Sequence, residues 1–120
     1  AMTVTSGQKF TFPVTGLWRV FLELQIYTSN AARYFEHEIR FSTDSGNNFD
    51  AHDAYDNLPH LQSGTTYGRI FQERFLNVTN ASTDRVAIAV SSSASTNVQG
   101  NNTDGKNISR LTFMRIGDAQ

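Results

Sequence analysis

The densest group of potential ligand residues lies in the segment DAHDAYD, residues 50–56. Carboxylate oxygens and an imidazole nitrogen at this spacing can bind a divalent cation such as calcium, or accept hydrogen bonds from sugar hydroxyls. The segment lacks the glycine and the terminal glutamate of a calcium-binding loop, and solvated loops collect such residues in any case. We therefore expect no cofactor, with calcium as the alternative. The candidate ligand-binding residues are His52, Asp53, Tyr55 and Asp56.

Three further residues could take part in ligand binding or catalysis: His37 and the pair Glu36 and Glu38. His37 alternates with apolar residues along a predicted strand, so we expect a hydrogen-bonded residue of the core or of an interface rather than a ligand. Two acids on one strand face can serve a glycosidase, but no other sequence feature supports that chemistry. We expect the two glutamates to pair with arginines across strands. The arginines considered for this pairing are Arg40, Arg69 and Arg74.

The rest of the sequence carries no catalytic signature. It has no Gly-x-Ser-x-Gly elbow, phosphate loop or dinucleotide fingerprint, and the absence of cysteine excludes disulfides and thiolate sites. A formal net charge of −1 without a basic run argues against nucleic-acid binding. No apolar run reaches the roughly 18 residues of a membrane span. We therefore expect a protein that is not an enzyme, does not bind nucleic acid and does not insert into a membrane.

Alternation of apolar and polar residues predicts six or more β-strands and no helix. A first strand through Phe10, Phe12 and Val14 meets a Pro-x-x-Gly corner and continues as a long strand. Further strands are predicted over residues 16–28, 33–43, 67–79 and 108–117, with a short one over 85–92, and the polar loops over residues 44–66 and 93–107.

The length of 120 residues suits one domain. Nine phenylalanines together with many Asn, Ser and Thr residues are typical of a β-protein with an aromatic core and polar loops. We expect residues 3–120 to form a single antiparallel β-sandwich of the jelly-roll type, with Ala1 and Met2 as additions ahead of the natural domain.

Several predicted strands carry large apolar residues on both faces. A strand of a sandwich buries one face and exposes the other, so the second set would form an apolar patch that monomers avoid. Each exposed phenylalanine would forfeit on the order of 2 kcal/mol of burial. Bulges or long loops that cover the second face are one explanation, and a homo-oligomer is the one we favour. The candidate interface residues are Phe21, Tyr27, Phe71, Phe75 and Phe113.

Three segments resemble one family. The run FTFPVTGLWRVFLELQIY resembles the opening of the C1q/tumour-necrosis-factor-like jelly roll, whose second strand typically begins Pro-x-x-Gly-x-aromatic; here Pro13, Gly16 and Trp18 match. The run NASTDRVAIAV resembles the family's Gly-Asp-x-Val stretch through Asp84 and Val86, with a threonine in place of the glycine. SRLTFMRIG stands where the family has its final strand. The family's glycine-rich run is reduced to SGTTYG, and no Gly-x-y stalk is present.

The resemblance implies a homotrimer of ten-stranded jelly rolls that presents loops to a ligand or receptor. Similar modules occur at the tips of phage and viral fibres, and the polar loops and lack of cysteine favour such a fibre head over an animal serum protein. We expect the C-terminal head of a fibrous protein, at the fibre tip of a virion or extracellular. Its loops 44–66 and 93–107 would recognise a host-surface glycan or protein. The alternatives are a purely architectural role, a monomeric carbohydrate-binding module, and a C1q-like binding domain of a cellular protein.

Overall fold

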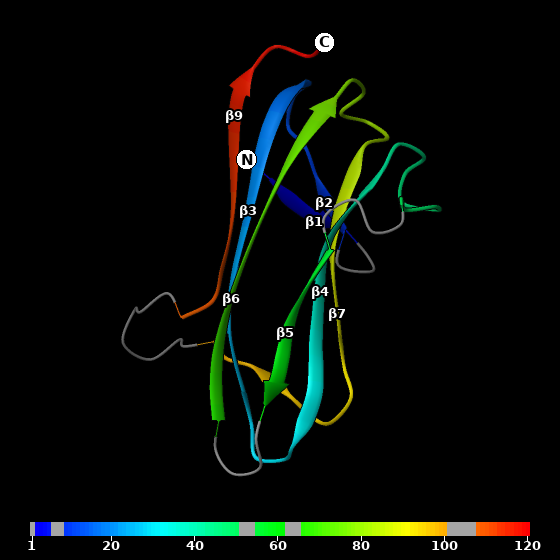
Figure 1. The fold of residues 1–120 in the computed structure, drawn as a ribbon. Coiled ribbons are helices and arrows are strands. Elements are labelled where there is room, and N and C mark those ends of the chain that lie inside the picture. The colour runs from blue at the N-terminus through cyan, green and yellow to red at the C-terminus, as the bar shows by residue number, and fades with distance from the viewer. Residues whose placement is uncertain (1, 6–8, 51–54, 62–65, 101–107) are drawn as a thin grey trace.

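The computed structural model describes residues 2–5, 9–50, 55–61, 66–100 and 108–120, which form two antiparallel β-sheets that face each other (Figure 1). This architecture is compatible with a β-sandwich and confirms the predicted all-β class. The described ranges contain no helix long and apolar enough to cross a membrane.

The first sheet has five strands in the order β1-β2-β7-β4-β5. Its strands are β1 (Thr3–Thr5), β2 (Lys9–Thr11), β7 (Arg85–Ser92), β4 (Ala32–Ser42) and β5 (Tyr55–Leu61). The second sheet is built around β3, which pairs with β6 along its whole length on one side and with β8 and β9 on the other. These strands are β3 (Gly16–Thr28), β6 (Thr66–Val78), β8 (Asn97–Val98) and β9 (Arg110–Gly117).

The apolar alternation of β3 determines where the core lies. Trp18, Val20, Leu22, Leu24 and Ile26 all point between the sheets and are buried. They meet the inward residues of the other strands, which are Phe12, Ala32, Phe35, Ile39, Ile70, Leu76, Val78 and Val86. Because period-2 alternation places these residues on one face of each strand, the sequence alone is enough to predict most of this core.

The long strands of the sequence prediction are confirmed nearly to the residue, but two predictions are wrong. The segment 44–66 is not one continuous loop, because β5 occupies residues 55–61 and pairs with β4. The first predicted strand is much shorter than its alternation suggests: β2 ends at Thr11, and a second short strand, β1, precedes it.

One edge of the sandwich is closed by an arginine that reaches from one sheet to the other. The side chain of Arg74 on β6 donates to the backbone carbonyl of Ile39 on β4 at 2.8 Å and pairs with the Asp50 carboxylate. Asp50 also accepts from the backbone N–H of Phe41 at 2.8 Å. β5 pairs only with residues 32–38 of β4. These contacts therefore supply hydrogen-bond partners for the backbone groups of Ile39 and Phe41, at the end of β4 that β5 does not reach.

Candidate functional site

The outer face of the second sheet carries an alternating pattern of aromatic and charged side chains across three strands. Cross-strand pairs on β3 and β6 place Arg19 opposite Phe75, Phe21 opposite Glu73, and Glu23 opposite Phe71. On the other side of β3, the same three rows end at the β9 residues Met114, Thr112 and Arg110. We call this surface, defined by the outward residues of β3, β6 and β9, the assembly face.

Its aromatic residues are largely exposed. Phe71 and Phe75 are 52% and 55% exposed, and Tyr67 is 57% exposed. Phe71 stacks on Phe21 with ring centroids 6.2 Å apart, and Tyr67 lies 5.9 Å from Tyr27. Met114 and Ile116 extend the apolar surface along β9. Several exposed rings on one face of a sheet are typical of a contact site rather than of an isolated monomer.

One ion pair of the assembly face joins diagonal neighbours on β3 and β6. Arg19 pairs with Glu73 on the neighbouring strand and also lies over the ring of Phe21, with Cζ 5.6 Å from the centroid. Diagonal neighbours across an antiparallel pair are within reach of long side chains. The diagonal pairing leaves the phenylalanine rings as the most prominent apolar groups between the ion pairs.

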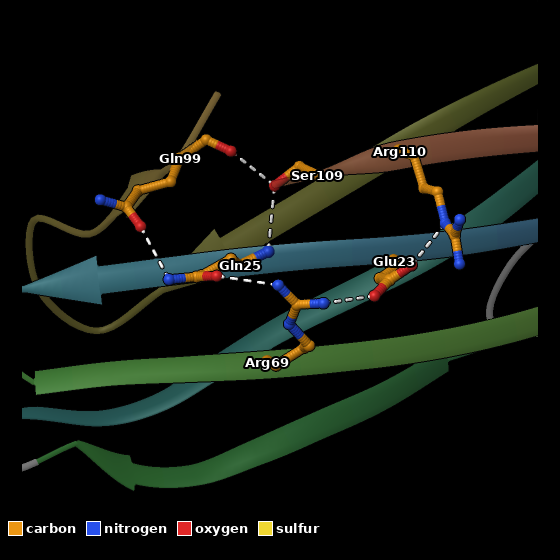
Figure 2. Close-up of polar contacts among 6 residues, drawn as sticks. All are labelled: Glu23, Gln25, Arg69, Gln99, Ser109 and Arg110. Carbon is orange, nitrogen blue, oxygen red and sulfur yellow. Dashed lines mark hydrogen bonds and ion pairs between the residues drawn. The ribbon is translucent and has the colours of Figure 1, made fainter. Parts of the chain in front are cut away.

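Glu23 is the centre of a second charged group, which bridges all three strands (Figure 2). Its carboxylate pairs with Arg69 of β6 and with Arg110 of β9, both at 2.5 Å, and its side chain is only 8% exposed. Arg69 also donates to the Gln25 side-chain carbonyl at 2.9 Å. We call Glu23, Arg69 and Arg110 the arginine–glutamate triad.

A hydrogen-bond network continues from the triad to the chain segments that follow β8. The Gln25 side-chain N–H donates to the Gln99 side chain at 2.9 Å, and the backbone N–H of Gln25 donates to Ser109 Oγ at 3.0 Å. Ser109 in turn donates to the Gln99 backbone carbonyl at 2.6 Å (Figure 2). The network therefore anchors both segments, around residues 99 and 109, to the centre of β3.

The structure brings together four of the five residues that the sequence placed at a subunit interface. Phe21, Tyr27, Phe71 and Phe75 all belong to the outer face of β3 and β6. Phe113 does not join them: it lies between the sheets, with its ring 5.4 Å from that of Phe10 and 6.2 Å from that of Phe12. Phe113 is thus part of the packing around the core, because β9 turns its odd-numbered residues inward from 111 to 113.

The predicted ligand-binding residues fall mostly where the structure gives no side-chain information. His52 and Asp53 lie outside the described residues, and Tyr55 and Asp56 belong to β5, where the structure describes the strand alone. Among the described residues, no group of histidine, aspartate or glutamate side chains is arranged to hold a metal ion. The ligand-binding prediction for these four residues therefore stays a prediction.

The described part of the same loop does form a hollow. A cavity of about 380 Å³ is lined by Phe41, Ser42, Thr43, Asp44, Asn48, Phe49 and Asp50. Asp44 organises this loop: its carboxylate accepts from Ser42 Oγ at 2.6 Å and from the backbone N–H groups of Asn47 and Asn48 at 3.0 and 2.9 Å. These hydrogen bonds, first of all those from Asn48, hold the pKa of the Asp44 carboxyl well below its ordinary value.

His37 and Glu38 lie buried on β4. His37 is buried among the inward residues of β4, which confirms the expectation of a core residue. Glu38 pairs with Arg40, two residues along its own strand. Its hydrogen bond and charge raise the pKa of the Arg40 guanidinium. Two of the expected arginine partners form ion pairs with other acids: Arg69 pairs with Glu23, and Arg74 pairs with Asp50.

A second cavity opens between the sheets at the edge where β1 and β9 lie. Its volume is about 360 Å³ and its lining is mainly apolar, from Val4, Phe10, Leu22, Leu24, Ile88 and Leu111, with Ser109 and Arg110 at its border. The hydroxyl of Ser109 and the Nε of Arg110 are already engaged by Gln25, Gln99 and Glu23. Sequence patterning does not reveal this cavity, because the same alternation fits a closed sandwich equally well.

The sequence matches no protein-family model, and no curated protein is similar enough to count as a relative.

Proposed function

We propose that this chain is a non-enzymatic jelly-roll module that self-associates, as a homotrimer, through the assembly face. The observation that supports the proposal is the row of exposed rings on β6, which are Tyr67, Phe71 and Phe75, together with the exposed apolar residues of β9 on the far side of β3. The ion pairs Arg19–Glu73 and Glu23–Arg69 beside the rings are already formed within the chain, so a second copy can cover these four residues without stripping water from isolated ions.

The burial gained at such an interface is large enough to matter. Covering a half-exposed phenylalanine removes apolar area worth on the order of 1–2 kcal/mol, and interfaces concentrate their energy in a few aromatic or arginine residues of this kind. A cyclic trimer buries such a face on every copy, which removes the exposed patch from the assembled molecule.

We further propose that the trimer is the head of a phage or viral fibre and recognises a host-surface glycan or protein. The β4–β5 loop supports this role, because its hollow combines the ring of Phe49 with carboxylate and amide groups of Asp44 and Asn48. Aromatic faces stack on sugar rings, while carboxylates and amides bond the hydroxyls. The loop extends from the first sheet and the assembly face belongs to the second, so the two surfaces are separate parts of the molecule.

Size-exclusion chromatography with light scattering tests the assembly directly. The wild-type protein should have three times the 13.4 kDa mass of the chain at micromolar concentration. The double variant Phe71→Ser/Phe75→Ser should lose at least about thirtyfold in association constant, since two anchors of more than about 1 kcal/mol each are removed, and should run as a monomer.

The control is Tyr34→Ser, which removes an exposed aromatic ring from the outer face of the other sheet. It should leave the mass unchanged. A wild-type protein that stays at 13.4 kDa across the micromolar range would contradict the proposal and favour a monomeric carbohydrate-binding module, for which the exposed rings would be the sugar platform.

A further inference from the structure

Arg110 has donor groups that no described residue of its own chain uses. Its Nε pairs with Glu23 (Figure 2), and its side chain makes no hydrogen bond or ion pair with any other residue that the structure describes. The side chain is 54% exposed. It lies in the same row of the assembly face as the exposed ring of Phe71, with Glu23 between the two.

The other arginines of this face differ in that respect. Arg69 uses one terminal nitrogen for Glu23 and the other for Gln25, and Arg19 is paired with Glu73. The arginine–glutamate triad contains two positive charges and one negative charge, so one positive charge is left over. Arg110 is the more exposed of the two arginines, at 54% against 42% for Arg69.

Burial of the assembly face would make this excess costly. A guanidinium that leaves water without acceptors for its N–H groups loses hydration that the Coulomb attraction of Glu23 alone does not replace. A bidentate contact with a carboxylate satisfies both terminal nitrogens at once. The chain as a whole has a formal net charge of −1, so acids outnumber bases on the rest of the molecule and a second copy can supply that carboxylate.

We propose that Arg110 binds a carboxylate of the neighbouring copy across the assembly face and thereby sets the register of the association. This inference rests on the proposed self-association and adds to it a specific inter-copy contact. In a cyclic trimer the two surfaces of each interface are different, so the carboxylate belongs to a different surface from the one that carries Arg110.

The variant Arg110→Gln tests the contact, with Arg33→Gln as its matched control. Arg33 is an exposed arginine on β4, in the other sheet, and no described acid pairs with its side chain. Association constants are measured by sedimentation equilibrium between about 50 and 500 mM NaCl, a range over which salt screens ion pairs strongly. R110Q should weaken association about 10- to 100-fold at low salt, as expected for a charge-assisted hydrogen bond, and should flatten the salt dependence. R33Q should match the wild type in both.

A second comparison separates this contact from support of Glu23 within one chain. In the Glu23→Gln background the effect of R110Q should persist if the acceptor belongs to another copy. The role of Arg110 is overturned if R110Q has no effect in the E23Q background. It is also overturned if R110Q leaves both the association constant and its salt dependence unchanged in the wild-type background. In either case self-association itself stands. A wild-type protein that is monomeric overturns both proposals. Should E23Q fail to fold, the salt dependence of R110Q alone decides.

Discussion

Among single residues, Asp44 shows how one carboxylate organises a whole turn. It follows β4 and accepts hydrogen bonds from Ser42, Asn47 and Asn48, while Ser45 and Gly46 adopt positive φ angles of 66° and 78°. A carboxylate that accepts several N–H bonds is favoured in its ionised form. The turn therefore depends on the charge of Asp44 as well as on its shape.

The lowered pKa of Asp44 predicts a loss of stability in acid. Because the folded pKa is depressed, the stabilisation by Asp44 is complete above the unfolded pKa of about 3.9 and declines as the pH falls below it toward the folded value. Asp44→Asn should lower the free energy of unfolding at pH 7, and its difference from the wild type should shrink between pH 5 and pH 2. Urea unfolding followed by the fluorescence of Trp18, the only tryptophan, measures this difference.

Asp118→Asn is the control, since Asp118 is 94% exposed at the end of β9. D118N should lower the free energy of unfolding at pH 7 less than D44N does. A D44N difference that stays constant from pH 5 to pH 2 would show that the charge of Asp44 does not stabilise the turn.

The sequence reveals residues that repeat with the strand period and misses those that depend on three-dimensional neighbours. The outward positions of Phe21 and Phe71 follow from alternation alone. The triad does not, because Glu23, Arg69 and Arg110 come from three strands whose register the sequence does not specify. A signal was nevertheless present, since Glu23 stands within a run of apolar residues on both sides, as a buried and paired acid would.

At the scale of elements, the Pro-x-x-Gly corner carries the chain from one sheet to the other. β2 ends at Thr11 in the first sheet and β3 begins at Gly16 in the second. Gly16 has a φ of +150°, and a Cβ there would lie 2.7 Å from the Gly117 carbonyl oxygen and 2.5 Å from Arg115 Nε. The indole N–H of Trp18 closes the corner with a 3.3 Å hydrogen bond to the Val14 carbonyl.

Gly16→Ala should therefore destabilise the fold by about 2–4 kcal/mol, from backbone strain together with the contact against the backbone of β9. Gly100→Ala is the matched control, because a Cβ at Gly100 meets no atom within 4 Å. Chemical denaturation at pH 7 compares the two. Equal stabilities for G16A and G100A would mean that β9 shifts freely away from the corner.

The two wrong predictions at this scale have a common physical cause. β2 and β5 are short or polar, and each is held in place by a long strand beside it: β2 by β7, and β5 by β4. Pro59 within β5 also argues against a strand from sequence, and it is accommodated because β5 is the edge of its sheet. Pairing with a neighbour, rather than local propensity, determines both elements.

At the scale of the whole molecule, the proposed functions divide between the two sheets. The first sheet carries the loop hollow near Asp44, and the second carries the assembly face. A change confined to the assembly face should leave the loop, and hence the intrinsic affinity for a glycan, intact. Such a change would prevent the loops of several copies from binding one glycan-bearing surface at the same time. That simultaneous binding multiplies apparent affinity without any new contact.

This separation predicts how the monomeric variant F71S/F75S should behave on an array of bacterial and animal glycans. For any glycan that the wild type binds, apparent affinity at high printed density should fall about 10²- to 10⁴-fold in the variant, which is the range that multivalent attachment supplies. Binding to the same glycan free in solution, measured by calorimetry per chain, should be equal for both proteins. Unequal affinity in solution would place the glycan site on the assembly face itself. A wild type that binds no glycan in either format would contradict glycan recognition and leave a protein receptor or an architectural role.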